Sequence, residues 1–259
     1  MPSSSLSIPD LAGKVVLVTG ASTGIGAALA RAYAEQGCKV GLHYNQSADA
    51  AEALAGEIRG KGGDVFLTQG DFSVSADVAR VVEETAAHFG RLDGLVNNAG
   101  GMLGRVPYSE MSDEQYDRVM DLNARSVITA SRVAMPWLKK NGGFIVNTSS
   151  VAARNGAGGG AGIYGSAKAF VSNVTRGMAK ELIGNGIRVN AVAPGVIATP
   201  FHERYSSAEQ MKGMIATIPQ GRAGTAEDCV GAYLFLSSDL LSGYITGQVI
   251  EVNGGQLMP

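Results

Sequence analysis

The chain of 259 residues is predicted to form an α/β domain around a doubly wound parallel sheet of about seven strands, with helices on both faces. Short β-branched apolar runs alternate with amphipathic stretches along the whole chain. Several of these runs are almost entirely apolar at their centres, as expected for strands that are buried on both faces of a parallel sheet. Such strand–helix alternation also implies right-handed crossovers between neighbouring strands.

Seven runs are predicted as strands, at 14–19, 39–44, 64–69, 92–97, 143–149, 187–193 and 248–253. Two of the helices between them have recognisable beginnings. Ser112 stands three residues before Gln115, the spacing of a capping box. Thr225 precedes Glu227 and Asp228, which lie where the helix dipole favours acidic side chains. No repeat or linker divides these elements, so residues 1–259 are predicted to form a single domain.

Composition excludes several classes of protein. The chain is 45% hydrophobic and 17% charged, which is typical of a soluble globular domain. A net charge of −2 without a basic run argues against nucleic-acid binding. No apolar stretch is long enough to span a membrane, and the start "MPSSSLSIPD" lacks the pattern of a secretory signal, so a cytoplasmic location is expected. Cys38 and Cys229 form no metal-binding motif, and no metal is required.

The turn "TGASTGIG", residues 19–26, allows two interpretations. Its G-x-S-x-G letters fit the nucleophile elbow of a hydrolase, with Ser22 as the attacking group. Alternatively, Gly20, Gly24 and Gly26 form a turn that places a dinucleotide pyrophosphate on a helix N-terminus.

The three histidines favour the second interpretation of this turn. A hydrolase needs a histidine late in the chain and an oxyanion donor from an earlier strand loop. Only His202 comes late enough, and no strand precedes the turn's own strand. His43 and His88 are interpreted as ordinary, partly exposed histidines. The hydrolase therefore stays a remote alternative.

The motif "YGSAK" places Tyr164 and Lys168 on one face of a helix, because residues four apart are neighbours there. A nearby cation favours the phenolate and lowers the tyrosine pKa from about 10. Such a phenol can exchange a proton with a carbonyl or hydroxyl group. The preceding strand end "IVNTSSVAA" offers Ser149 and Ser150, and a glycine-rich segment at 156–162, predicted to be a flexible loop, leads back towards them.

Taken together, these motifs resemble those of the classical short-chain dehydrogenase/reductase family over nearly the whole chain. The resemblance rests on "TGASTGIG", "NNAG" (97–100), Asn123 in "MDLNARS", "NTSS", "YGSAK" and "APGVIATP" (193–200). It implies a Rossmann-like fold, a homotetramer, and hydride transfer between NAD or NADP and the carbonyl or hydroxyl group of a small molecule. A non-catalytic, cofactor-binding regulator on the same fold would be expected to have lost Tyr164 or Lys168, and both are present.

The resemblance also implies roles for four catalytic residues. Tyr164 would be the general acid/base, and Ser150 would orient the substrate carbonyl. Lys168 would bind the nicotinamide ribose and lower the tyrosine pKa, and Asn123 would support a proton-relay water. Ser149 is a rival for the serine role, but Ser150 matches the second serine of the family pattern.

Expected cofactor contacts come from several segments of the chain. Asp71 would approach the adenine amino group, and Phe72 would donate its backbone amide. The full set comprises Gly20, Ser22, Thr23, Gly24, Ile25, Gly26, Tyr44, Asn45, Gln46, Ser47, Asp71, Phe72, Asn98, Ala99, Gly100, Tyr164, Lys168, Pro194, Gly195, Ile197 and Thr199.

The second strand predicts a modest preference for NADP over NAD. NAD-specific folds place an acid at the end of this strand to bind the ribose hydroxyls, and residues 43–47 contain none. Asp49 lies too far into the next helix. Asn45, Gln46 and Ser47 can instead donate hydrogen bonds to a 2′-phosphate. NADP-dependent relatives often carry an arginine in the glycine turn, where this chain has Thr23, so the preference is not expected to be strict.

Residues 10–200 are predicted to form the cofactor and catalytic core, and 200–222 a substrate lid that faces the segment 100–110. The lid mixes polar side chains with methionines, which favours a sugar, polyol or hydroxy acid as substrate. The alternative substrate is a 3-oxoacyl thioester. The helical stretches 112–140 and 163–183 carry many small or apolar residues, among them Ala167, Ala169, Phe170 and Val171, which suggests contacts between subunits.

Overall fold

The computed structural model describes residues 7–258. Residues 1–6 of the chain start "MPSSSLSIPD" lie outside this range. Its centre is a parallel sheet of seven strands in the order β3-β2-β1-β4-β5-β6-β7. The strands are β1 (Val15–Val18), β2 (Lys39–Tyr44), β3 (Val65–Gln69), β4 (Gly94–Asn97), β5 (Gly143–Thr148), β6 (Ile187–Pro194) and β7 (Val249–Val252). The predicted strands and fold class are thereby confirmed.

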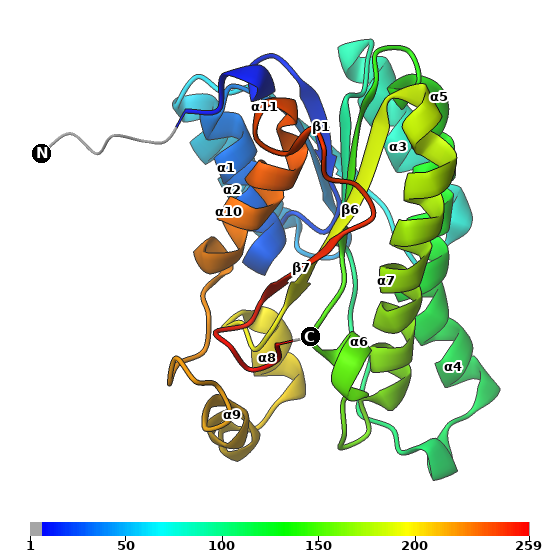
Figure 1. The fold of residues 1–259 in the computed structure, drawn as a ribbon, viewed down its shortest axis with the longest axis vertical. Coiled ribbons are helices and arrows are strands. Elements are labelled where there is room, and N and C mark those ends of the chain that lie inside the picture. The colour runs from blue at the N-terminus through cyan, green and yellow to red at the C-terminus, as the bar shows by residue number, and fades with distance from the viewer. Residues whose placement is uncertain (1–6, 259) are drawn as a thin grey trace, which may run out of the picture.

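Helices cover both faces of this sheet (Figure 1). One layer consists of α1 (Gly24–Glu35), α2 (Ala48–Gly60) and α10 (Ala226–Ser237), and the other of α3 (Ser75–Phe89), α5 (Ser126–Leu138) and α7 (Gly162–Leu182). The shorter helices are α4 (Asp113–Met120), α6 (Ala152–Asn155), α8 (Pro200–Tyr205), α9 (Ala208–Ile215) and α11 (Asp239–Ser242). The helical stretch predicted at 112–140 is divided by a π-helical turn, Asp121–Arg125.

Strand β1 shows why the sheet is covered by a layer of helices on each face. Its side chains alternate between faces, as they must in a strand. Val16 and Val18 pack in the core beneath α1, α2 and α10, whereas Val15 and Leu17 pack beneath α3, α5 and α7. All four are fully buried. The continuous apolar run of the sequence is therefore a strand that is covered on both faces.

Both predicted helix beginnings, one from a capping-box spacing and one from acidic residues in the first turn, are present. The Ser112 hydroxyl accepts a hydrogen bond from the backbone N–H of Gln115 at 3.1 Å, directly before α4. Thr225 and Asp228 form a complete capping box at the start of α10. Each side chain satisfies a backbone donor that the first helical turn would otherwise leave unpaired.

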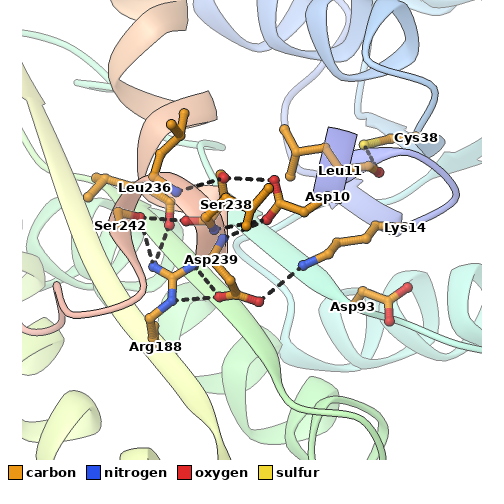
Figure 2. Close-up of polar contacts among 12 residues, drawn as sticks. Asp10, Leu11, Lys14, Cys38, Asp93, Arg188, Leu236, Ser238, Asp239 and Ser242 are labelled. Atoms are coloured by element: carbon orange, nitrogen blue, oxygen red, sulfur yellow. Dashed lines mark hydrogen bonds and ion pairs between the residues drawn. The ribbon is translucent and has the colours of Figure 1, made fainter. Parts of the chain in front are cut away.

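A polar network joins the segment at Asp10 to the segment around α11, at the end of the sheet where β6 begins (Figure 2). Buried Arg188 donates from Nε to Asp239 Oδ1 at 2.9 Å and from Nη1 to the Leu236 carbonyl at 2.7 Å. Asp10 accepts from the Ser238 hydroxyl at 2.8 Å and from the Asp239 backbone N–H at 2.7 Å. This network holds the short helix η1 (Pro9–Leu11) against α11. It lies at the amino ends of the strands, opposite their carboxyl ends.

Within the described residues, no helix combines the length and the apolar character needed to cross a membrane. The expected cytoplasmic location and the single domain at 1–259 stay predictions.

Candidate active site

A cleft of about 920 Å³ lies at the carboxyl ends of the strands. Its walls include the turn after β1, the segments that follow β2, β4, β5 and β6, and the lid helices α8 and α9. Strand order reverses between β1 and β4, because the chain first runs outward to β3 and then returns to the other side of β1. Parallel α/β sheets bind their ligands at such a switch point.

The glycines of the turn are required by close backbone contacts. Gly20 has φ of 63°, and a Cβ there would lie 2.9 Å from Ala99 Cα. A Cβ at Gly26 would collide with the Gly20 carbonyl oxygen. The Asn98 amide bonds that same carbonyl at 3.1 Å. Helix α1 begins at Gly24, so its first backbone N–H groups face the cleft, where they can bind phosphate.

His43 holds this turn in place and is not the partly exposed histidine that the sequence predicted. Its side chain is 2% exposed and stacks on Phe72 with ring centroids 3.9 Å apart. Nδ1 accepts a hydrogen bond from the Gly20 N–H at 3.0 Å, so Nε2 carries the proton and donates to the Gly70 carbonyl at 3.0 Å. Burial lowers the pKa of His43 to about 4. A neutral ring therefore joins the glycine turn to the segment after β3. Only the apolar character of β2 signalled this burial.

Most of the predicted cofactor residues line the cleft: Gly20, Ser22, Thr23, Gly24, Ile25, Gly26, Asn45, Gln46, Ser47, Phe72, Asn98, Ala99, Gly100, Tyr164, Lys168, Pro194, Gly195, Ile197 and Thr199. Tyr44 and Asp71 do not. Tyr44 packs against the core, and the Asp71 carboxylate accepts hydrogen bonds from the Ser73 N–H at 2.9 Å and hydroxyl at 2.7 Å. The contacts of these two residues with a cofactor stay predictions.

The predicted catalytic residues meet where β5 ends beside the first turns of α7. Tyr164 and Lys168 lie on one face of α7, and the Ser150 hydroxyl bonds the Tyr164 phenol. Ser149 points elsewhere, because its hydroxyl donates to the Lys168 carbonyl at 3.1 Å and bonds the Ser172 hydroxyl at 2.6 Å. The geometry therefore favours Ser150 over Ser149 as the serine that meets a substrate.

The sequence predicts that Lys168 lowers the pKa of Tyr164, but in the structure the pKa of Tyr164 is raised. Burial raises the pKa of Tyr164 to about 12, with the Ser150 hydrogen bond opposing the shift. Burial lowers the pKa of Lys168 to about 8. The Lys168 ammonium donates to the Thr148 carbonyl oxygen at 2.8 Å, and desolvation rather than a lysine–phenol interaction sets the tyrosine pKa. The phenol is consequently protonated at neutral pH, the form that can give a proton to a carbonyl oxygen.

Asn123 is fully buried in the π-helical turn between α4 and α5. Its amide donates to the carbonyl oxygens of Gly101 at 2.8 Å and Val119 at 2.9 Å, and its Oδ1 accepts from the Gly101 N–H at 3.1 Å. The side chain therefore fixes the loop after β4, next to Lys168, and does not itself line the cleft. Its support of a relay water stays a prediction.

The lid and two loops enclose the remaining side of the cleft. The Phe201 ring on α8 lies 5.6 Å from the Tyr164 ring and 5.2 Å from that of Tyr205. The glycine-rich segment 156–162 is not an isolated flexible loop. Its Gly160 carbonyl accepts a hydrogen bond from the Val106 N–H at 2.9 Å, which joins it to the segment after β4.

Comparisons with known proteins find similar chains over almost the whole length of this one. Residues 20–256 match the protein family described as enoyl-(acyl carrier protein) reductase. The 3-oxoacyl-[acyl-carrier-protein] reductase of Synechocystis sp. is 40% identical over 249 residues, which cover 96% of this chain and 98% of the relative. FabG of Escherichia coli, which bears the same enzyme name, is 38% identical over 247 residues, with 95% and 98% covered.

Two solved structures are similarly close. A short-chain type dehydrogenase/reductase from Mycobacterium marinum superposes with a TM-score of 0.91 at 34% identity, covering 97% of this chain and 98% of the other. An NADH-dependent reductase responsible for alginate metabolism gives 0.90 at 38% identity, covering 97% and 100%.

The chain therefore belongs to the short-chain dehydrogenase/reductase family. It is an NAD(P)-dependent oxidoreductase that acts on a small molecule. This assignment decides against both the hydrolase at Ser22 and the non-catalytic regulator.

Proposed function

We propose that the protein reduces 3-oxoacyl thioesters to their 3-hydroxy forms with a reduced nicotinamide cofactor. The observation that carries the proposal is the meeting of Tyr164, Ser150 and Lys168 in the cleft, with the apolar Phe201 ring 5.6 Å from the Tyr164 ring. The curated relatives described above are named as reductases of such substrates. They give no support to the expected sugar, polyol or hydroxy acid, and the thioester alternative takes its place.

The catalytic residues suit reduction of a ketone. A carbonyl oxygen placed between the Ser150 hydroxyl and the Tyr164 phenol would accept a hydrogen bond from each, and both bonds strengthen as negative charge develops on that oxygen. Tyr164 then gives its proton to the oxygen. Lys168, whose ammonium donates to the Thr148 carbonyl, would bind the nicotinamide ribose. The bound cofactor supplies the hydride.

The lining of the substrate half fits an acyl chain. Phe201 on α8, Met214 on α9 and Met102 after β4 all line the cleft. Flexible methionine side chains adapt to apolar surfaces of different shape. An acyl chain would lie against these three side chains with its 3-oxo group directed to Tyr164.

For the cofactor, we propose a modest preference for NADP(H). Asn45, Gln46 and Ser47 line the cleft after β2, and the described lining contains no carboxylate that would repel a 2′-phosphate. Competition between NADPH and NADH, measured as dissociation constants, tests the preference. An NADH constant tenfold below that for NADPH would contradict it.

We also propose that the protein is a homotetramer. Two of the four residues named for subunit contacts, Ala167 and Val171, belong instead to the buried core. Phe170 on α7 remains 39% exposed and supports the proposal. Light scattering at micromolar concentration is expected to give the tetramer mass, and a monomer mass would refute the proposal.

The proposed substrate is tested by assaying the purified protein in both directions. With NADPH the candidates are a 3-oxoacyl thioester, a sugar and an oxo acid, and with NADP+ they are a polyol and the matching hydroxy acid. Cofactor absorbance follows the reaction, and Tyr164→Phe is the inactive control. We expect the thioester to have the highest kcat/KM. Turnover of a sugar or hydroxy acid without turnover of the thioester would restore the original expectation.

A further inference from the structure

The charged side chains that line the cleft are all basic. Arg105, Lys168 and Arg204 line it, and no aspartate or glutamate of the described residues does. The whole chain has 23 acidic and 21 basic residues. The excess of positive charge is therefore a feature of the cleft and not of the whole chain. Lys168 belongs to the catalytic group. Arg105 and Arg204 lie on the substrate side, in the segment after β4 and on α8, away from the adenosine-side residues Asn45–Ser47.

Arg105 is held by neutral groups alone. Its Nε donates to the Tyr205 carbonyl at 2.7 Å, its Nη1 to the Gly159 carbonyl at 3.1 Å, and its Nη2 to the Ser206 hydroxyl at 3.4 Å. No carboxylate of residues 7–258 lies within ion-pair distance of this guanidinium. A guanidinium has five N–H donors, so two remain for a ligand.

These contacts orient the Arg105 side chain without neutralising it. The hydrogen bonds that join the lid to segment 156–162 require only N–H donors, which a neutral side chain also provides. This structural role therefore does not require the positive charge of Arg105. The positive charge is felt inside the cleft, since it adds to the effect of burial in lowering the pKa of His202 on α8. A planar cation held in this way is suited to an oxyanion, which it can bind through two parallel hydrogen bonds.

We propose that Arg105, together with Arg204, binds an anionic group that the substrate carries away from its reacting carbonyl. This inference rests on the proposed function. In an oxoacyl thioester, the anion is either the phosphate of the carrier arm or a carboxylate on the acyl chain. The Phe201 ring contacts the rings of both Tyr164 and Tyr205, and the Tyr205 carbonyl accepts a hydrogen bond from Arg105, so the anionic group would lie on the Tyr205 side of this aromatic cluster. Arg105 is thus a residue that determines specificity.

Two matched pairs of substrates test the proposal and distinguish the sources. The first pair consists of two thioesters of the same 3-oxoacyl group, one with pantetheine and one with phosphopantetheine. The other is a 3-oxo ester whose acyl chain ends in a methyl group or in a carboxylate. We expect the wild-type protein to prefer the anionic member of at least one pair by about tenfold in kcat/KM, the lower range for a hydrogen bond to a charged group. Arg105→Gln should bring that ratio close to one, and Arg204→Gln should lower it.

The ratio separates charge recognition from a structural role. A loosened lid would lower kcat/KM equally for both members of a pair and leave their ratio unchanged. Arg59→Gln is the matched control, because Arg59 on α2 also donates to a backbone carbonyl, that of Val65, but lies outside the cleft. A wild-type ratio near one in both pairs, or a ratio that survives Arg105→Gln, overturns the proposal.

Binding measurements keep the test independent of turnover. With NADP saturating, calorimetry compares phosphopantetheine with pantetheine, and a dicarboxylate with its monoester. If no oxoacyl compound is reduced, the proposed function fails, while tighter binding of an anionic member that depends on Arg105 still supports the anion site. Equal binding of both members in both pairs would refute the anion site even in an active reductase.

Discussion

The Lys168 ammonium lies 5.7 Å from the centroid of the Tyr164 ring and donates to the Thr148 carbonyl oxygen at 2.8 Å. Helix α7 supplies both side chains, and β5 supplies the carbonyl that anchors the lysine. The lysine is 3% exposed, so its charge acts in a poorly solvated site. The protonation states of Tyr164 and Lys168 therefore depend on their burial in the folded cleft.

Tyr164→Phe should retain cofactor binding and lose turnover. Loss of a general acid typically costs roughly a hundred- to ten-thousand-fold in rate. The phenylalanine ring keeps the contact with Phe201, so the apolar wall remains. Steady-state kinetics together with cofactor titration measures the two effects, and a variant that retains a tenth of wild-type turnover would contradict the assignment.

Ser149→Ala and Ser150→Ala should have different consequences. The Ser150 hydroxyl acts on the Tyr164 phenol, so its removal should lower kcat by about tenfold or more. It also accepts a hydrogen bond from the Ala152 N–H at 3.1 Å, so some stability is lost with it, but the main effect should be on kcat. Ser149 is buried against Ser172, so its removal should mainly lower stability, by about 1 kcal/mol. Kinetics and denaturant unfolding of both variants measure this. The reverse pattern would make Ser149 the catalytic serine.

Cofactor binding near pH 8 should take up protons at Lys168. Its pKa is lowered to about 8 by burial, so about half of the sites carry a neutral amine at that pH. The anionic dinucleotide favours the ammonium, so binding raises this pKa and draws protons from the buffer. Affinity should accordingly fall as the pH rises above about 8.

Calorimetry in buffers of different ionisation enthalpy measures this uptake. Lys168→Met should bind the cofactor more weakly and without proton uptake at the same pH. Equal heats in all buffers for the wild-type protein would argue against the mechanism.

His43 should make the protein less stable as the pH falls. The folded-state pKa is lowered to about 4, whereas an unfolded histidine takes up a proton near ~6.5. Between these values the unfolded state binds more protons, so the free energy of unfolding decreases as the pH drops through this window. From pH ~7.5 to pH ~5, this site should contribute a loss of about 2 kcal/mol.

Denaturant unfolding of His43→Gln at both pH values checks this prediction. The variant should be less stable at neutral pH and should lack His43's share of the pH dependence. His88→Gln is the matched control, because His88 is exposed on α3, and it should keep the full wild-type pH dependence. Identical pH dependence in the wild type and His43→Gln would disprove the role of the buried ring.

Thr23→Arg should strengthen the preference for NADPH. Thr23 lines the cleft directly before α1 and makes no side-chain capping bond there. An arginine could form a charge-assisted hydrogen bond with a 2′-phosphate, and we expect the ratio of NADH to NADPH dissociation constants to rise about tenfold. Thr23→Gln supplies length without charge and should change the ratio little. A ratio unaffected by the arginine would place the 2′-phosphate elsewhere.

Local patterns made much of the fold predictable. The seven apolar runs form the seven strands of the sheet. Helices begin where the capping-box spacing at Ser112 and the acidic first turn after Thr225 predict them. The helical stretch from 112 to 140 was predictable as helix, but its division by the π-helical turn at Asn123 was not. In that turn Asn123 is hydrogen-bonded to Gly101, which is 22 residues distant in the chain, and a local pattern does not indicate such a contact.

The sequence by itself determined the alternating strands and helices, the glycine turn and the Tyr164–Lys168 spacing, because each depends on residues a few positions apart. Only the tertiary structure decided the burial of His43, the direction of Ser149 and the raised tyrosine pKa. It also decided the position of Arg105, which bonds the carbonyls of Gly159 and Tyr205 across 54 and 100 residues of chain. Desolvation and the meeting of distant loops depend on packing, and no local sequence pattern records them.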